Sequence, residues 1–179
     1  MIPPSKHSNN YVIFVVGGAS SGKSDLALTF CSDVQPKAFV ATCEPLDEEM
    51  TDRIVQHQRA RQGQWDTAEV PLHLPEWFQE HGRKYSNVVL DCLTLWLSNL
   101  QGNGLSRDDI GTCVQKLLAA IQVVPGKVVL VSNELGMGLV PLDSETRGFR
   151  SMAGTVNQQM AHAADEVYFA VSGLPLKIK

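Results

Sequence analysis

Long apolar runs, clusters of basic residues and closely spaced cysteines are all missing from this sequence of 179 residues. Fifteen Lys and Arg stand against nineteen Asp and Glu, which gives a net charge of −4, and no basic block occurs. The charge pattern therefore gives no support for binding to nucleic acid or to an anionic membrane surface. Four cysteines are scattered without C-x-x-C spacing, at positions 31, 43, 92 and 113. That scatter favours cytosolic thiols over disulfides or a zinc site.

No stretch is apolar over the length that a membrane-spanning helix needs. The first ten residues, MIPPSKHSNN, are polar and lack the apolar core of a signal peptide. We expect residues 1–10 to form a flexible tail and residues 11–179 to form a single α/β domain. We also expect a cytoplasmic protein with no stable membrane insertion.

Strand-like apolar runs alternate with helical patterns, and no internal repeat interrupts them. The alternation predicts a mostly parallel sheet with helices on both faces. A turn at Ser172-Gly173 would return residues 174–178 as an antiparallel edge strand, where Pro175 is tolerated. The other strands are predicted at 11–16, 38–42, 87–91, 127–132 and 166–171. Helices are predicted at 25–30, 45–61, 75–84, 93–100, 106–121 and 145–164, with 64–74 and 133–143 irregular.

The segment 17–24 reads GGASSGKS and fits the phosphate-binding pattern G-x-x-x-x-G-K-[ST]. A predicted strand precedes it and a predicted helix follows it, which is the context that the pattern requires. Such a turn points several backbone N–H groups at one spot, so a polyphosphate fits there. Lys23 would reach the outer phosphates and the Ser24 hydroxyl would hold Mg²⁺. A turn that only closes a strand–helix corner is the alternative.

Asp91 ends an apolar strand, and ligands of open α/β sheets bind at the carboxyl ends of strands. A carboxylate there can hold the water shell of Mg²⁺ opposite Ser24. Asp91 could instead cap the helix that follows it.

His57 is a second unusual residue, because it falls on the apolar stripe of a predicted helix, with Leu46, Met50 and Ile54. An interior histidine is one interpretation. An imidazole nucleophile is the other, since it can attack an α-phosphorus, displace pyrophosphate and carry the nucleotidyl group.

Several other polar residues fall near the expected ligand edge or on neighbouring helices. Each has an ordinary structural alternative, either as a turn cap or as helix-surface charge. Arg59, Arg61, Arg147 and Arg150 are possible phosphate contacts, and Glu69, Asn133 and Glu134 are possible functional residues near the ligand edge.

Taken in order, the motifs resemble a known family from about residue 11 to the last residue. The most specific blocks are R-I-x-x-H at 53–57, N-E-x-G-M-G at 133–138 and S-G-x-P-x-K-I-K at 172–179. They resemble the bifunctional adenosylcobinamide kinase/adenosylcobinamide-phosphate guanylyltransferase of cobalamin biosynthesis. The resemblance implies a P-loop NTPase fold with a recombinase-core-like sheet, and a homotrimer.

The resemblance also implies two reactions. A nucleoside triphosphate, ATP or GTP, phosphorylates the aminopropanol hydroxyl of adenosylcobinamide with Mg²⁺ as cofactor. GTP then guanylylates a histidine, and GMP passes to the cobinamide phosphate to give adenosylcobinamide-GDP. By motif position His57 matches that histidine. Lys23 is the other catalytic residue, and Ser24 and Asp91 are the metal ligands.

The nucleotide contacts implied by the resemblance belong to the phosphate loop, to residues 41–43, to the end of the helix predicted at 45–61 and to two carboxylates. They are Gly17, Gly18, Ala19, Ser20, Ser21, Gly22, Lys23, Ser24, Ala41, Thr42, Cys43, Gln58, Arg59, Ala60, Arg61, Glu69 and Asp91. Cys43 stands where Ser is familiar in the family, and Asp91 where some relatives carry Glu. One relative has adjacent histidines where Gln56 precedes His57 here.

Two rival functions fit the phosphate loop as well. A single-activity small-molecule kinase would use only the triphosphate site. A non-catalytic nucleotide-binding module would bind nucleotide without turnover. Retention of the α-phosphate of GTP on His57 separates both from the two-step enzyme.

Overall fold

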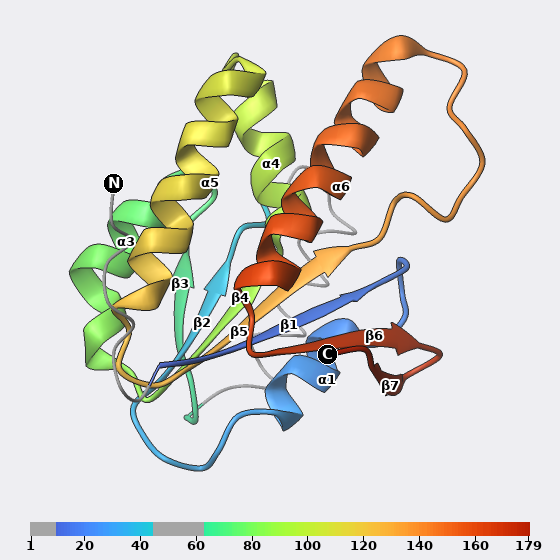
Figure 1. The fold of residues 1–179 in the computed structure, drawn as a ribbon. Coiled ribbons are helices and arrows are strands. Elements are labelled where there is room, and N and C mark those ends of the chain that lie inside the picture. Colours follow the sequence, from blue (N-terminus) through green and yellow to red (C-terminus); the bar gives the residue numbers. More distant parts are fainter. Residues whose placement is uncertain (1–9, 45–62) are drawn as a thin grey trace.

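A computed structural model describes residues 10–44 and 63–179 of the chain (Figure 1). Its centre is a seven-stranded sheet in the order β3-β2-β4-β5-β1-β6-β7. All neighbouring strands are parallel except β6 and β7, which are antiparallel. This arrangement confirms the predicted sheet and its antiparallel C-terminal edge strand. The strands are β1 (Tyr11–Gly17), β2 (Lys37–Ala41), β3 (Asp66–Glu69), β4 (Asn87–Asp91), β5 (Lys127–Asn133), β6 (Glu166–Val171) and β7 (Leu174–Lys177).

Helices cover both faces of this sheet, as the alternating pattern predicts (Figure 1). α1 lies on one face, and α3, α4, α5 and α6 lie on the other. The bounds are α1 (Lys23–Thr29), α3 (Leu74–His81), α4 (Leu93–Gly102), α5 (Arg107–Gln122) and α6 (Ser144–Ala163), with a 3₁₀ turn at Gly82–Lys84. The helix predicted at 45–61 lies outside the described residues.

Successive residues of β1 feed two separate cores, because side chains alternate across a strand. Val12, Phe14 and Val16 join the larger core beneath α3, α4, α5 and α6. Ile13 and Val15 join the smaller one beneath α1. A strand buried on both faces reads as the continuous apolar run seen in the sequence. Among residues 10–44 and 63–179, no helix has the length and apolar character that crossing a membrane requires.

α5 illustrates how local sequence fixes an element's start. The Ser106 hydroxyl accepts a hydrogen bond from the Asp109 N–H at 3.2 Å, and the Asp109 carboxylate accepts one from the Ser106 N–H at 3.3 Å. This reciprocal capping box satisfies two backbone donors that the helix leaves unpaired. The predicted start of the helix is therefore confirmed.

Two local predictions differ from the structure. The stretch 64–74 was expected to be irregular, yet it contains β3, whose register pairs Ala41 with Glu69. β3 is short and largely exposed, so pairing with β2 rather than apolar patterning makes it a strand. Asn10, expected in a flexible tail, is buried, and its amide donates to the carbonyls of Ile121 and Val124 at 2.9 Å each.

Candidate functional site

The carboxyl ends of the parallel strands bring five predicted site residues to one edge of the sheet. The register pairs Ala41 at the end of β2 with Glu69 on one side and Asp91 on the other. Gly17 ends β1 on the same edge, where it pairs with Asn133 of β5. Residues far apart in sequence thus face one ligand edge, as open α/β sheets arrange them.

The segment from Gly18 to Gly22 forms the loop that links β1 to α1. Ala19 and Ser20 at its tip are exposed, whereas Lys23 is buried. Gly22 caps α1 with φ 85°, a backbone conformation that L residues other than glycine rarely adopt. The Lys23 ammonium donates to the carbonyl of Gly18 and lies 3.4 Å from the Ser21 hydroxyl. The lysine therefore closes the loop on itself.

Burial lowers the pKa of Lys23 from its ordinary value, and the nearby carboxylate of Asp91 opposes that shift. The half-buried Asp91 is therefore close enough to Lys23 for an electrostatic interaction. An ammonium that has already lost part of its hydration interacts strongly with an arriving phosphate. Lys23 and Asp91 place charges of opposite sign at this edge.

Contacts from two distant segments support the loop. The N–H of Gly173, in the turn between β6 and β7, donates to the Ser21 carbonyl at 2.9 Å. The N–H of Glu134, just after β5, donates to the Gly17 carbonyl at 2.9 Å. Gly17 itself must stay a glycine, because a Cβ there would lie 2.5 Å from the carbonyl oxygen of Ala170. The S-G and N-E blocks of the sequence thus meet the phosphate loop.

Thr42 holds two strand ends together. Its hydroxyl donates to the Cys92 carbonyl and accepts from the Cys92 N–H, both at 2.8 Å. Its own N–H donates to the Asp91 carbonyl at 3.1 Å, and its carbonyl accepts from the Asn99 amide at 2.8 Å. The residue is fully buried. These contacts place Asp91, a role that the expected nucleotide contact of Thr42 did not include.

A polar network that the sequence did not point to fixes the end of β5. The hydroxyls of Thr94 and Ser132 lie 3.1 Å apart, and the Thr94 hydroxyl accepts from the Asn133 N–H at 2.8 Å. The Asn157 amide donates to the Asn133 carbonyl at 3.0 Å. Asn133 thus contributes through its backbone to the shape of the edge.

Arg147 and Arg150 hold the loop between β5 and α6 in this structure. Arg147 donates to the carbonyls of Pro141 and Leu142, at 3.0 and 2.5 Å. Arg150 donates to the carbonyl of Leu139 at 2.8 Å and to that of Gly136. Both guanidinium groups therefore shape a loop, a role that neither interpretation from the sequence included, and Arg147 is exposed as a helix-surface charge would be.

Glu134 serves as a local cap. Its carboxylate accepts from the Gly136 N–H at 2.5 Å, as the structural alternative predicted. Of the remaining predicted contacts, Glu69 is exposed at the end of β3, and Cys43 is half-buried after β2. His57, Gln58, Arg59, Ala60 and Arg61 lie outside the described residues.

Ser24 and Asp91 supply oxygen donors of the kind that Mg²⁺ prefers. The described residues contain no group of three or more His, Cys, Asp or Glu that could hold a metal. Mg²⁺ in nucleotide sites keeps several waters and takes phosphate oxygens beside one or two protein ligands, and Mg²⁺ held by Ser24 and Asp91 stays a prediction.

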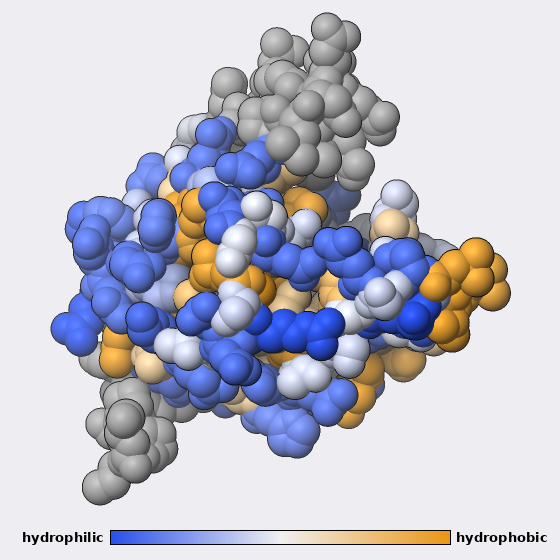
Figure 2. Space-filling view, turned by 90° about the horizontal axis from the view of Figure 1, so that it is seen from above, coloured by the Kyte–Doolittle hydropathy of each residue, from blue (hydrophilic) through white to orange (hydrophobic). Residues whose placement is uncertain are grey.

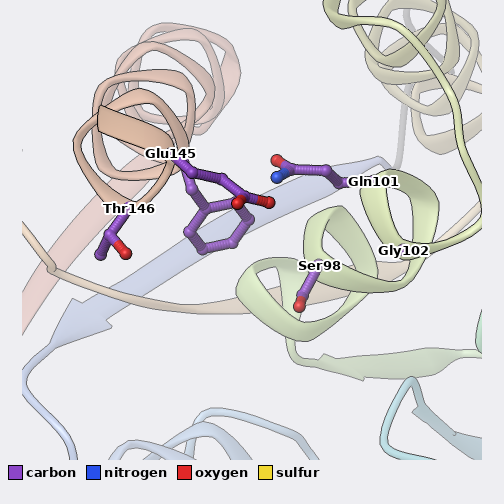
Figure 3. Close-up of a pocket in the computed structure, with 6 residues that line it drawn as sticks. Ser98, Gln101, Gly102, Glu145 and Thr146 are labelled. Carbon is purple, nitrogen blue, oxygen red and sulfur yellow. The ribbon is translucent and has the colours of Figure 1, made fainter. Parts of the chain in front are cut away.

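A separate pocket lies between α4 and α6 (Figure 3). Gln101 of α4 and Glu145 of α6 point toward one another across it, with Ser98 and Thr146 nearby. None of the predicted site residues lines this pocket. It therefore does not enter the chemistry considered for the sheet edge.

Comparison with known proteins gives consistent matches. The family model described as cobinamide kinase/cobinamide phosphate guanyltransferase matches residues 13–178. The bifunctional adenosylcobalamin biosynthesis protein CobU of Escherichia coli strain K12 is 41% identical over 180 residues, covering 94% of this chain and 99% of that protein. The bifunctional protein CobP of Pseudomonas aeruginosa is 37% identical over 169 residues, covering 92% and 95%.

A KaiC-like protein of Pyrococcus horikoshii OT3 shares the fold with a TM-score of 0.53, over 90% of this chain and 71% of that chain. At 12% identity this likeness concerns the fold alone, and it agrees with the predicted recombinase-core-like sheet. The phosphate-loop architecture, the match over residues 13–178 and the near full-length relatives agree, and the chain belongs to the cobinamide kinase/cobinamide phosphate guanyltransferase family.

Proposed function

We propose that this chain phosphorylates adenosylcobinamide and then transfers GMP from GTP to the product, through a guanylylated His57. The observation that carries the proposal is the phosphate-binding loop in a chain of this family, with Lys23 and Asp91 interacting at the carboxyl edge of the sheet. Phosphoryl transfer depends mainly on positioning and charge neutralisation, which this edge supplies.

In the kinase step, Lys23 exchanges the Gly18 carbonyl for the outer phosphates of the bound triphosphate, ATP or GTP. The loop N–H groups hold the remaining phosphate oxygens. The aminopropanol hydroxyl attacks the terminal phosphorus, the bond to the nucleoside diphosphate breaks, and the hydroxyl proton is released. Buried Lys23 stabilises the negative charge on the transferred group more strongly than an exposed ammonium would.

In the kinase step, the Ser24 hydroxyl and the Asp91 carboxylate would hold Mg²⁺. When bound, the ion neutralises charge on the outer phosphates. Thr42 keeps Asp91 in place by tying the end of β2 to the backbone of Asp91 and Cys92. Ser24 sits in the first turn of α1, so the same helix start presents both Lys23 and this hydroxyl.

In the guanylyltransferase step, the neutral imidazole of His57 attacks the α-phosphorus of GTP and pyrophosphate leaves. The GMP is then passed from the imidazole nitrogen to the phosphate oxygen of the cobinamide phosphate. A covalent intermediate divides one difficult transfer into two. The proposed guanine-nucleotide contacts remain Ala41, Thr42, Cys43, Gln58, Arg59, Ala60, Arg61, Glu69 and Asp91. Support for them comes from motif position within the family.

GTP labelled in the α-phosphate tests the covalent step. The wild-type protein should retain acid-labile label and His57→Ala should not. His81→Ala, at the exposed end of α3, is the matched control and should retain the label. Absence of label in the wild type, with cobinamide still phosphorylated, would leave a single-activity kinase. Nucleotide binding with neither reaction would leave a binding module.

We further propose a homo-oligomer, for which the resemblance gives a trimer. Exposed apolar side chains on β7 and beside it, Leu174, Leu176 and Ile178, support self-association. Sedimentation velocity of the purified chain tests it, and a monomer at micromolar concentration counts against it.

We place the reactions in the cytoplasm, where nucleoside triphosphates are available; cell fractionation with antibody detection tests this.

A further inference from the structure

The loop between β5 and α6, residues 134–143, carries an unusual set of exposed apolar side chains. Met137 is 78% exposed, Leu139 97%, Val140 70% and Leu142 99%. Hydrophobic residues gather at the right edge of the molecule in Figure 2, the side on which both this loop and the turn between β6 and β7 project in Figure 1. Contiguous exposed apolar surface on a protein commonly marks a binding site.

This loop is held in shape by its own arginines. Arg147 and Arg150 donate to the carbonyls of Gly136, Leu139, Pro141 and Leu142. Asp143 closes the loop by accepting from the Thr146 N–H at 2.7 Å, which caps α6. With these carbonyls engaged by the guanidinium groups, the apolar side chains are presented to solvent. A surface ordered before binding loses less entropy when a ligand arrives.

The loop also begins at the phosphate site. The N–H of Glu134 donates to the Gly17 carbonyl at 2.9 Å, and β5 pairs directly with β1. The loop that carries the apolar side chains therefore starts at the edge that holds Lys23. A ligand whose reactive group reaches the terminal phosphate would have its remaining atoms beside that edge.

We infer that residues 137–142 bind the corrin macrocycle of the cobinamide substrate, an inference that rests on the proposed function. The hydroxyl to be phosphorylated lies on a flexible aminopropanol arm, so the large ring stays outside the phosphate loop. The ring carries methyl groups as well as amide side chains, and its methyl and methylene groups can pack on an apolar surface. The loop carbonyls that accept hydrogen bonds from the arginines already have partners, so covering this surface with a ligand does not leave them unsatisfied.

Equilibrium dialysis with cobinamide, followed by the visible absorbance of the corrin, tests the inference without turnover. The double variant Leu139→Ser/Leu142→Ser should bind cobinamide at least tenfold more weakly than the wild type. Its KM for cobinamide should rise by a similar factor, while GTP-dependent self-labelling stays unchanged. Both side chains are almost fully exposed, so the melting temperature should not change.

Val34→Ser is the matched control, because Val34 is also an exposed apolar residue, at 58%, but lies before β2 at the opposite edge of the sheet. It should bind cobinamide as the wild type does. Unchanged cobinamide binding by the double variant would overturn the inference. So would a smaller oligomer in sedimentation velocity together with weakened binding, which would assign the loop to contacts between copies. A wild-type protein that binds cobinamide through this loop without turnover would contradict the proposed function alone.

Discussion

Replacing Thr42 by valine tests whether this residue positions the catalytic edge. Valine keeps the shape of threonine and removes only the hydroxyl. That hydroxyl makes two hydrogen bonds of 2.8 Å with the backbone of Cys92, in a fully buried position. The substitution leaves the Cys92 N–H and carbonyl without these partners.

The expected loss follows from those two bonds. An intramolecular hydrogen bond contributes about 0.5–1.5 kcal/mol net, and an unsatisfied buried group costs about 1–3 kcal/mol. We expect Thr42→Val to lower the free energy of unfolding by about 2–4 kcal/mol. For a domain of this size that lowers the melting temperature by roughly 5–15 °C.

Thr42→Ser separates the hydroxyl from the methyl group. Serine keeps both hydrogen bonds and loses one buried methyl, which costs about 1 kcal/mol. Urea unfolding followed by circular dichroism measures both variants without nucleotide. A valine variant within about 0.5 kcal/mol of the wild type would refute the role drawn from these contacts, and so would a serine variant less stable than the valine variant.

Three further predictions concern the loop and its neighbours. Gly17→Ala should destabilise the protein by about 1–3 kcal/mol or more in the same urea assay, because its Cβ meets a backbone carbonyl of β6 at 2.5 Å. Gly18→Ala is the control, because the new Cβ has open space around it, and it should be neutral or stabilising by up to about 1 kcal/mol. Asp91→Asn removes the interaction that raises the pKa of Lys23, so Lys23 should lose its proton at a lower pH than in the wild type. The affinity for nucleotide without magnesium, measured by fluorescence titration, should therefore fall at a lower alkaline pH. If the pH at which half of this affinity is lost stays the same or rises in the variant, the prediction is wrong. Burial, with the Asp91 charge adding to it, raises the pKa of the Cys92 thiol to about 12. Iodoacetamide at pH 8 should therefore leave Cys92 unmodified in the native protein and modify it after denaturation, which peptide mass spectrometry measures. Rapid modification of Cys92 in the native protein would contradict its burial.

Strong local patterns account for what could be predicted of this fold. β1, β4 and β5 are continuous apolar runs, and a Ser–Asp capping box marks the start of α5, so their sequences specify their structure. β3 could not be predicted in this way. Its sequence is D-T-A-E, and only the hydrogen bonds to β2 make it a strand.

The phosphate loop was predictable for a similar reason, since its glycines and lysine serve a local backbone shape. Its supports were not. Gly173 meets Ser21, and Glu134 meets Gly17, through backbone N–H groups and carbonyls that every residue carries. Side-chain types therefore gave no signal for these contacts. Only the family blocks containing Gly173 and Glu134 hinted that those segments matter.

The same reasoning explains why the arginines of α6 were difficult to interpret. A guanidinium near a phosphate site can contact phosphate or backbone carbonyls, and sequence spacing is the same for both. Arg147 and Arg150 are committed to carbonyls of the β5–α6 loop. Arg147 makes both of its bonds through Nη1, and Arg150 makes its two bonds through Nη1 and Nη2, so each guanidinium keeps further N–H donors. Lys23 is likewise bound to a carbonyl, that of Gly18, so a carbonyl partner does not by itself separate a phosphate-binding cation from a structural one, and the observed contacts of the two arginines account only for the shape of the loop.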